Sequence, residues 1–165
     1  MATIQKITPN LWFDNQAEEA AKYYVSIFRN SHIGKVSHYG KEGQEIHGQK
    51  PGTVLTIEFF LDGQRFLGLN GGPVFKFNEA VSFIIDCDTQ DEIDYYWNKL
   101  TAGGDPKAQQ CGWLKDKFGL SWQVVPTSVA EMLNDPDTKK TDRLMKALFP
   151  MKKLDKKALE DAFNG

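Results

Sequence analysis

The sequence predicts an α+β protein made of two βαβββ modules followed by a C-terminal helical tail. Two observations favour paired modules: hydrophobic spacing changes from alternating to helical and back twice, and a Gly-rich stretch separates the two copies. A third observation favours the tail, because the last part of the chain shows only helical spacing. We assign residues 1–74 to the first module, 75–127 to the second and 128–165 to the tail, and treat the three as one domain overall.

A short apolar strand and an amphipathic helix open the first module. The strand lies within residues 8–15 and ends at Asp14-Asn15, a pair typical of turns and helix caps. Residues 16–28 then carry apolar side chains at helical spacing, with charged side chains between them. The residues predicted to face the core are Ala17, Ala20, Ala21, Tyr24 and Phe28.

The remainder of the first module predicts three strands and one loop. Residues 31–40 have strand character, and residues 41–52 combine Gly, Pro and charge, which is typical of a loop. Residues 53–72 contain two β-rich runs on either side of Asp62-Gly63, the dipeptide suited to a two-residue type I′ turn. We therefore expect a β-hairpin to close the module.

The second module repeats this order. A helix over residues 89–104 can begin at Thr89, whose hydroxyl caps it, with Glu92 as the capping-box partner three residues on. The predicted strands lie in residues 80–88, 107–117 and 120–127, and the middle segment has room for one or two short strands.

The tail predicts two or three amphipathic helices over residues 129–165. One apolar stripe contains Leu144, Leu148 and Phe149. A second stripe contains Leu154, Leu159 and Phe163, and Pro150 separates the two. We expect the tail to pack on the modules or on a partner chain.

Composition excludes several classes of protein. The net charge is −2, and Lys and Arg are spread along the chain, so no basic block marks a nucleic-acid surface. No apolar run approaches the ~20 residues needed to span a bilayer, and the N-terminal residues lack a signal core. Cys87 and Cys111 are too few for a disulfide framework or a four-cysteine zinc site. We expect a soluble cytoplasmic protein with no nucleic-acid or membrane partner.

Three stretches resemble a known family. "LWFDNQAEEAAKYYVSIF" (11–28), "LGLNGGP" (67–73) and "WLKDKFGLSWQVVP" (113–126) are similar to the PhnB-like branch of the glyoxalase and bleomycin-resistance superfamily, also called vicinal oxygen chelate. The resemblance covers roughly residues 4–127. It implies a cupped sheet made by two βαβββ modules, a homodimer and, in many members, a divalent ion in the cup.

The branch often carries the label 3-demethylubiquinone-9 3-methyltransferase, which the sequence does not support. A nucleotide-type cofactor usually needs a Gly-rich loop after the first strand and an acidic residue about twenty positions on. This sequence has no such arrangement. The fold that the resemblance implies is not a methyltransferase fold either.

The resemblance also allows a test for the metal site. Metal-using relatives take His, Glu or Gln from the first and fourth strands of each module, since a divalent ion needs lone pairs from imidazole or carboxylate. The matching positions lie near Thr8, near Phe66 or Gly68, near Ser82, and at Gln123. Only Gln123 offers a ligand atom, and one amide cannot hold a metal, so we expect no metal and no cofactor.

The three histidines of the chain are the other candidate metal ligands. His32 and His38 share a predicted strand at an even separation, so they face the same side, but they lie roughly 20 Å apart when extended. His47 lies in the loop. We interpret all three as partly exposed side chains that do not share a metal.

Glu58 and Cys111 are the candidate catalytic residues. Glu58 is expected on the cup side of its strand, opposite Leu55, Ile57 and Phe59, where an apolar surround would raise its pKa and make it a general base. A pair with Arg65 across the hairpin is the favoured alternative. Cys111 could be a nucleophile if a His or Lys lowered its pKa, but a structural cysteine is favoured.

The expected ligand-binding residues combine aromatic rings and amides. They are Trp12, Asn70, Trp113, Trp122 and Gln123. Aromatic side chains on concave strands suit flat or apolar ligands. The first hypothesis is therefore a metal-independent protein that binds a small molecule in the cup. The second is a metal-independent enzyme of the superfamily acting through Glu58 or Cys111, and the third is a purely structural or partner-binding dimer.

Overall fold

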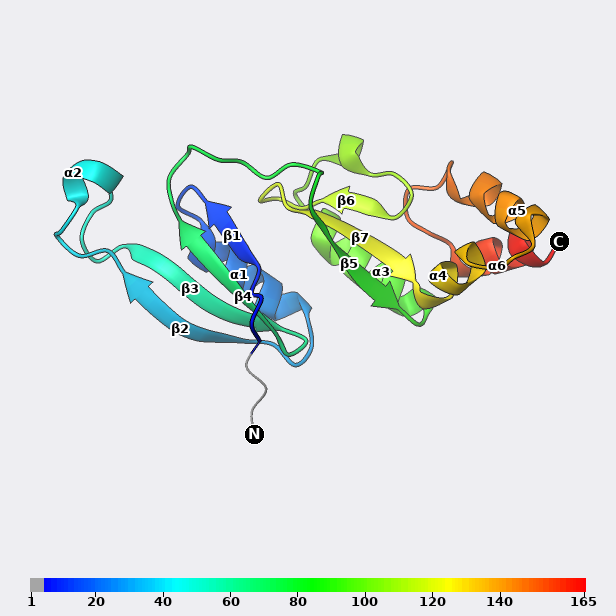
Figure 1. The fold of residues 1–165 in the computed structure, drawn as a ribbon, viewed down its shortest axis with the longest axis horizontal. Helices are drawn as coiled ribbons and strands as arrows, with labels where there is room; N and C mark the ends of the chain where they lie inside the picture. Colours follow the sequence, from blue (N-terminus) through cyan, green and yellow to red (C-terminus); the bar gives the residue numbers. More distant parts are fainter. Residues whose placement is uncertain (1–4) are drawn as a thin grey trace. The chain divides into compact units, whose positions relative to one another are not determined.

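The computed structural model describes residues 5–165. The chain divides into two compact units, the first ending at Lys76 and the second beginning at Phe77 (Figure 1). We describe each unit by itself. The module boundary expected after residue 74 stays a prediction.

The first unit contains a four-stranded sheet and two helices. Its elements are β1 (Asn10–Phe13), α1 (Ala17–Ile27), β2 (His32–His38), α2 (Gln44–His47), β3 (Val54–Leu61) and β4 (Gln64–Asn70). The strand order is β1-β4-β3-β2, with β1 parallel to β4 and the other pairs antiparallel. This is the predicted βαβββ order, with one short helix added in the loop between β2 and β3.

Helix α1 covers one face of this sheet and makes the core of the first unit (Figure 1). Tyr24 is fully buried and stacks on Phe59 at 6.1 Å between ring centroids. The predicted core residues Ala17, Ala20 and Ala21 are also fully buried, which confirms the helical pattern. Burying one large apolar side chain contributes about 1.5–3 kcal/mol. The helix therefore fixes which side of each strand stays open.

The hairpin between β3 and β4 turns as the sequence predicted. Asp62 and Gly63 have φ values of 47° and 78°, and Leu61 pairs with Gln64. Two consecutive positive φ angles define the type I′ turn, whose twist matches that of the flanking strands.

The second unit contains a three-stranded sheet. Its first elements are β5 (Ser82–Cys87), α3 (Gln90–Thr101), a 3-10 helix η1 (Pro106–Ala108), β6 (Trp113–Lys115) and β7 (Ser121–Pro126). The order is β5-β7-β6, with β5 parallel to β7.

The second module therefore has one strand fewer than the βαβββ pattern predicts in the part of the chain that is described. Pro106 and the cap of Asp105 on Lys107 favour a 3-10 turn, so only Gln110 remains to pair, in an isolated bridge with Trp113. Between them Cys111 and Gly112 have φ values of 51° and 83°, a second type I′ turn.

Helix α3 begins as predicted and covers one face of the second sheet. The hydroxyl of Thr89 accepts from the Glu92 amide at 3.2 Å, and the Glu92 carboxylate accepts from the Asp88 amide at 2.8 Å. The first bond satisfies a free N–H group in the first turn of the helix, and the second fixes the residue just before the N-cap. Ile93, Trp97 and Leu100 of α3 are buried.

The tail forms three helices with a core of their own. They are α4 (Thr127–Leu133), α5 (Thr138–Leu148) and α6 (Lys156–Asn164). This core contains Val129 and Met132 of α4, Leu144 of α5, Leu159 of α6 and Leu154 from the segment just before α6. Phe149 departs from its predicted stripe and is 57% exposed, because it follows the last residue of α5, where the helical spacing ends.

Backbone hydrogen bonds attach the tail to the turn before β6. The amides of Cys111 and Gly112 each donate at 2.8 Å to the carbonyl groups of Met151 and Lys152. The Gln90 side chain also accepts from the Lys156 amide at 2.9 Å and donates to the Leu154 carbonyl at 3.2 Å. The tail is therefore an integral part of the second unit.

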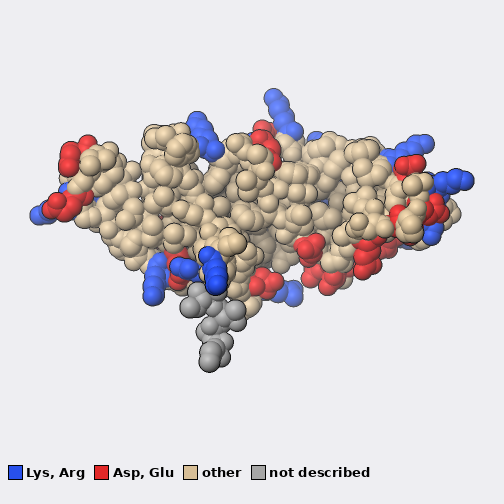
Figure 2. Space-filling view, in the orientation of Figure 1, with Lys and Arg blue, Asp and Glu red and all other residues tan. Residues whose placement is uncertain are grey.

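No helix within residues 5–165 is long and apolar enough to cross a membrane. On the face shown in Figure 2, basic side chains are scattered among acidic ones, and no broad basic patch is visible.

Candidate functional site

Each sheet has a face that its helix leaves uncovered. In the first unit, Leu11 and Phe13 of β1 and Phe59 of β3 are buried on the α1 side, so the residues that alternate with them point the other way. We call this the first open face. Its side chains, placed by strand register, are Trp12, Thr56, Glu58, Phe60, Arg65, Leu67 and Leu69.

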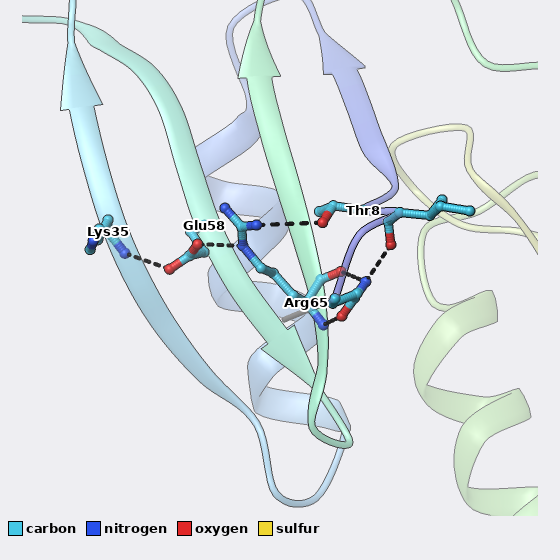
Figure 3. Close-up of polar contacts among 6 residues, drawn as sticks. Thr8, Lys35, Glu58 and Arg65 are labelled. Atoms are coloured by element: carbon cyan, nitrogen blue, oxygen red, sulfur yellow. Dashed lines mark hydrogen bonds and ion pairs between the residues drawn. The ribbon is translucent and has the colours of Figure 1, made fainter. Parts of the chain in front are cut away.

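An ion pair occupies the centre of the first open face (Figure 3). Arg65 Nε lies 2.5 Å from Glu58 Oε2, and Arg65 Nη1 donates to the Thr8 hydroxyl at 3.5 Å. The Lys35 amide lies 3.5 Å from Glu58 Oε1. The pair between Glu58 and Arg65 was the favoured expectation, and it is confirmed.

A bulge in β2 makes room for this carboxylate. The register of β2 against β3 shifts between Ile33 and Val36, and Gly34 lies within the shift. A Cβ atom on Gly34 would lie 2.5 Å from Glu58 Oε1. Gly34 therefore belongs to the site, and its only signal in the sequence is a Gly inside a predicted strand.

The ionisation of Glu58 differs from the expectation of a raised pKa. The hydrogen bond from Arg65 lowers the pKa of Glu58, against the raising effect of burial. Its side chain is only 15% exposed, but the guanidinium replaces the water that burial removes. Glu58 is thus held as a carboxylate, and the apolar surround that would have made it a strong base is not present.

Trp12 lies at the edge of the first open face in a fixed position. Its indole N–H donates to the Gly72 carbonyl at 2.8 Å, and Phe75 contacts it edge-on at 5.0 Å between centroids. A Cβ on Gly71 would overlap the Trp12 ring at 2.2 Å, so the ring lies directly over that glycine. The "NGGP" stretch therefore serves to seat Trp12.

Asn70 braces the fold and does not point onto the first open face. It is 6% exposed, its Oδ1 accepts from the Ala17 amide at 2.8 Å, and its Nδ2 donates to the Val54 carbonyl at 3.0 Å. The side chain therefore holds the start of α1 against the sheet. We leave Asn70 out of the ligand-binding set proposed for the open faces.

A row of three residues crosses the open face of the second sheet. Ile84 of β5 pairs with Gln123 of β7, and Gln123 pairs with Trp113 of β6. All three point away from α3, because Ile85, Val124 and Leu114 beside them are buried. We call this side the second open face, and it brings together two of the predicted residues, Trp113 and Gln123.

The polar groups of this row are only partly used. Gln123 Nε2 donates to the Ser82 hydroxyl at 2.9 Å, and its other amide end makes no hydrogen bond within residues 5–165. The Trp113 indole N–H likewise has no partner in the described chain. Ile84 is 59% exposed. Next to this row, the buried Ser121 hydroxyl is also without a hydrogen bond.

Trp122 lies on the opposite, buried side of β7. It is 3% exposed, and its indole N–H donates to Asp116 Oδ2 at 2.8 Å. Asp116 Oδ1 accepts from the amides of Phe118 and Leu120 at 2.9 and 3.1 Å. Position 122 falls on the α3 side because side chains alternate along a strand. Trp122 therefore belongs to the core, and we leave it out of the proposed ligand set.

Asp116 is a residue that sequence reasoning missed. It is 2% exposed and organises the turn before β7 through three hydrogen bonds. An Asp at the start of a turn can bond the backbone two residues on. That local pattern was visible in "DKFG", but the bond to Trp122 depends on the tertiary fold.

Cys111 lies in the type I′ turn that the tail covers. Its Sγ is 3.5 Å from the Phe149 carbonyl, and Gln110 Nε2 lies 3.5 Å from the same sulfur. Within residues 5–165, its sulfur makes no hydrogen bond or ion pair with a His or Lys side chain. Burial raises the pKa of the other thiol, Cys87, to about 12. Neither cysteine has the cationic neighbour that activates a nucleophile.

The donor atoms on the open faces do not fit a divalent metal. Phe66 and Gly68, near which the fourth-strand position was expected, face α1, and the open-face residue between them is Leu67. In the second unit, Ser82 and Gln123 are hydrogen bonded to each other. No group of three or more His, Cys, Asp or Glu is positioned to hold a metal within residues 5–165.

Comparison with known proteins places the chain in a family. The family model for 3-demethylubiquinone-9 3-methyltransferase matches residues 5–125. A solved structure from Bacillus cereus, named as a PhnB protein with the same methyltransferase description, is 36% identical, with a TM-score of 0.63, and covers 74% of this chain and 100% of its own. The chain belongs to the PhnB-like family. It is therefore a member of the vicinal oxygen chelate superfamily.

More distant structures share the fold of this PhnB-like chain. Protein PA1353 of Pseudomonas aeruginosa is 17% identical with a TM-score of 0.56, covering 75% of this chain and 98% of its own. The fosfomycin resistance protein FosX of Listeria monocytogenes is 13% identical with a TM-score of 0.53, covering 81% and 100%. At these identities the likeness concerns the fold alone. No curated protein matches the chain.

Proposed function

We propose that this PhnB-like protein binds a small apolar or aromatic molecule on the second open face without a metal. The observation that carries the proposal is the row of Ile84, Gln123 and Trp113, in which an exposed apolar side chain and an indole flank an amide. The family match supports the proposal, since the resemblance implies a cupped sheet, and a concave sheet surface suits a small ligand.

The chemistry of the row favours a flat ligand with one or two polar atoms. Trp113 offers a ring face and an indole N–H with no partner in the described part of the chain, and Gln123 offers one amide end fixed in orientation because Ser82 holds the other. A few oriented polar groups among apolar side chains are typical of small-molecule sites.

Thermal-shift measurements with 1-naphthol and quinoline test this proposal. A probe that binds the folded protein at about 100 times its Kd adds about 2.7 kcal/mol to the free energy of unfolding. We expect such stabilisation in the wild type and its loss in Trp113→Ala. Tyr95→Ala is the matched control, because Tyr95 is an aromatic side chain on α3 with 42% exposure. An equal response of Trp113→Ala and wild type would count against the proposal.

A metal-independent enzyme is the second candidate, and one observation favours it. Glu58 is held as a carboxylate on the first open face beside a guanidinium, and a fixed charge pair of this kind can orient a polar substrate. Cys111 is the weaker candidate because nothing activates its thiol. Turnover that survives in Glu58→Gln would exclude this role. The methyltransferase description is a family name, and we do not propose that activity.

We also propose a homodimer in the cytoplasm. Strand β5 is an edge strand of its sheet, and Val81 just before it is 63% exposed. Exposed apolar edges are typical of association surfaces. Both cysteines are free, which suits a reducing compartment. Light scattering coupled to size exclusion measures the oligomeric state, and a monomer at micromolar concentration would contradict the dimer.

A further inference from the structure

The first unit contains a cavity whose lining includes none of the residues that define the first open face. It measures about 600 Å³ and lies where β2 ends, β3 begins and β4 ends, beside the start of α1. Its lining residues are Asn15, Glu18, His38, Gly48, Gln49, Lys50, Gly52, Thr53, Val54 and Asn70. Neither the ion pair of Glu58 nor Trp12 lines it. Its volume is within the range of small-molecule sites.

The floor of the cavity is rigid. The Asn70 side chain is bonded to the backbone of Ala17 and Val54, and the Tyr39 hydroxyl donates to the Asn70 carbonyl at 2.5 Å. These bonds tie α1, β3, β4 and the end of β2 together. A ligand there would meet a preorganised surface, which lowers the entropic cost of binding.

The loop between β2 and β3 builds the wall. The Tyr39 amide donates to the Thr53 carbonyl at 2.9 Å, and the Gly52 amide donates to the Tyr39 carbonyl at 2.8 Å, closing the loop at its base. His47 stacks on Tyr39 at 4.4 Å, and its Nδ1 accepts from the Gln49 amide at 3.0 Å. These contacts fix the backbone that carries Gln49 and Lys50.

Hydrogen-bond donors predominate among the side chains that remain available. The Lys50 ammonium, the His38 ring and the amides of Asn15 and Gln49 have no side-chain partner within residues 5–165. The one acidic lining residue, Glu18, is engaged by Lys22 at 2.7 Å. A site with a free ammonium and several donors suits an anion, because charge-assisted hydrogen bonds are the strong ones.

We propose that this cavity binds a small organic anion, a molecule bearing a carboxylate or phosphate group, with Lys50 and His38 as its principal contacts. The site is independent of the second open face, so the two proposals can fail separately. Carboxylate and phosphate share the chemistry that the cavity offers, and the experiment distinguishes them.

Amide chemical shifts of the full-length ¹⁵N-labelled protein test the proposal, with inorganic phosphate in one titration and succinate in the other, at constant ionic strength. We expect saturable shifts at residues 15–18, 49–54 and 70, with a Kd on the order of 1 mM for at least one probe. The probe that saturates identifies the anion class. Shifts that rise without saturation, or none with either probe, would overturn the proposal.

Two lysine variants separate a built site from general attraction of anions. Lys50→Gln removes the lining ammonium, and Lys41→Gln removes one positive charge from the same loop outside the cavity. We expect Lys50→Gln to weaken binding by about tenfold and Lys41→Gln by less than about twofold. His38→Gln gives a second reading of the same site. Equal weakening by both lysine variants would show non-specific attraction and defeat the proposal.

Discussion

Arg65 fixes the charge of the one carboxyl group at the centre of the first open face. It contacts Glu58 at 2.5 Å, and Gly34 leaves the space that the carboxylate occupies. The pair therefore depends on a bulge in β2 as much as on the two charges. A cross-strand pair of this kind can be predicted from strand register, but the bulge cannot, because the half-exposed residues of β2 carry no clear apolar alternation in which an extra residue would show as a phase change.

The first prediction concerns the pH dependence of stability. Because Arg65 lowers the pKa of Glu58 in the folded state, the pair stabilises the fold above the ordinary value of 4.5 and loses this effect as pH falls through the lower folded value. We expect Glu58→Gln to reduce the free energy of unfolding by about 1 kcal/mol at pH 7. Urea unfolding at a series of pH values measures this effect, and the free energies of unfolding of wild type and Glu58→Gln should converge at acid pH.

Glu131→Gln provides the control for this measurement. Glu131 is exposed on α4 and makes no ion pair with the described residues. Removing the Glu131 carboxylate should leave the difference in the free energy of unfolding between pH 7 and acid pH the same as in wild type. If the free energies of unfolding of wild type and Glu58→Gln differ by the same amount at every pH, the ion pair has no role in the pH dependence of stability.

The second prediction concerns Asp116, whose carboxylate accepts three hydrogen bonds inside the core. Asp116→Ala leaves the Trp122 indole and two backbone amides without partners, which costs about 1–3 kcal/mol for each group that stays buried. Asp116→Asn keeps an oxygen for the two backbone amides that bond to Oδ1. It places its NH₂ group against the indole N–H of Trp122, so two donors face each other and that hydrogen bond is lost.

A double-mutant cycle isolates the bond between the two side chains. Trp122→Phe removes the indole N–H, so the cost of Asp116→Asn should be smaller in a Trp122→Phe background than in wild type. Urea unfolding of the four proteins measures the coupling energy. Strict additivity of the two substitutions would show that the hydrogen bond contributes nothing.

At the scale of elements, two type I′ turns set the ends of short strands. Asp62-Gly63 carries the dipeptide that this turn favours and was predicted from it. Cys111-Gly112 adopts the same turn without that dipeptide, and its residue Cys111 has a φ of 51°, which costs a side chain roughly 1–2 kcal/mol. The backbone amides of Cys111 and Gly112 donate to the carbonyl groups of Met151 and Lys152 in the tail, and these bonds hold the turn in place.

The third prediction compares two glycines with similar backbone angles. Gly112 and Gly119 have φ values of 83° and 87°, but a Cβ on Gly112 would lie 2.9 Å from the Val124 carbonyl, and one on Gly119 would meet nothing within 4 Å. Gly119→Ala should therefore cost about 1 kcal/mol from backbone strain alone, and Gly112→Ala at least 1 kcal/mol more from the clash. Denaturant midpoints measure both, and equal costs would contradict the close approach.

Element spacing explains which parts of the fold and site were predictable. Period and turn signals located α1, α3 and the β3–β4 hairpin, because each follows from local residues. The same alternation assigned Trp12, Trp113 and Gln123 to sheet faces that remain open. It did not show that Trp122 is buried and that Gln123 lies on the open face, because which face of the sheet is covered depends on where α3 packs. The missing fourth strand and the bonds of Asn70 likewise depend on tertiary contacts.

At the scale of the whole molecule, the tail lies outside the family match yet belongs to the second unit. The match ends at residue 125, and α5 and α6 lie beyond it. These helices nevertheless bury Leu144 and Leu159 completely. The tail also satisfies the backbone of the turn before β6. The second open face is built on that turn and the strand after it, so its geometry should depend on the tail.

The last prediction follows from this dependence. Ending the chain after Asn134 removes α5 and α6 and exposes Val129 and Met132, whose partners are lost. We expect amide hydrogen exchange to lose protection in β6 and β7, and probe binding that requires Trp113 to weaken by about tenfold or more, while β3 and β4 of the first unit keep their protection. In the full-length chain, Leu159→Ala should destabilise the second unit by about 2–5 kcal/mol through the cavity it leaves. Wild-type protection of β6 and β7 in the shortened chain would contradict this prediction. It would mean that α5 and α6 do not stabilise the second sheet and that the sheet alone holds the turn at Cys111-Gly112.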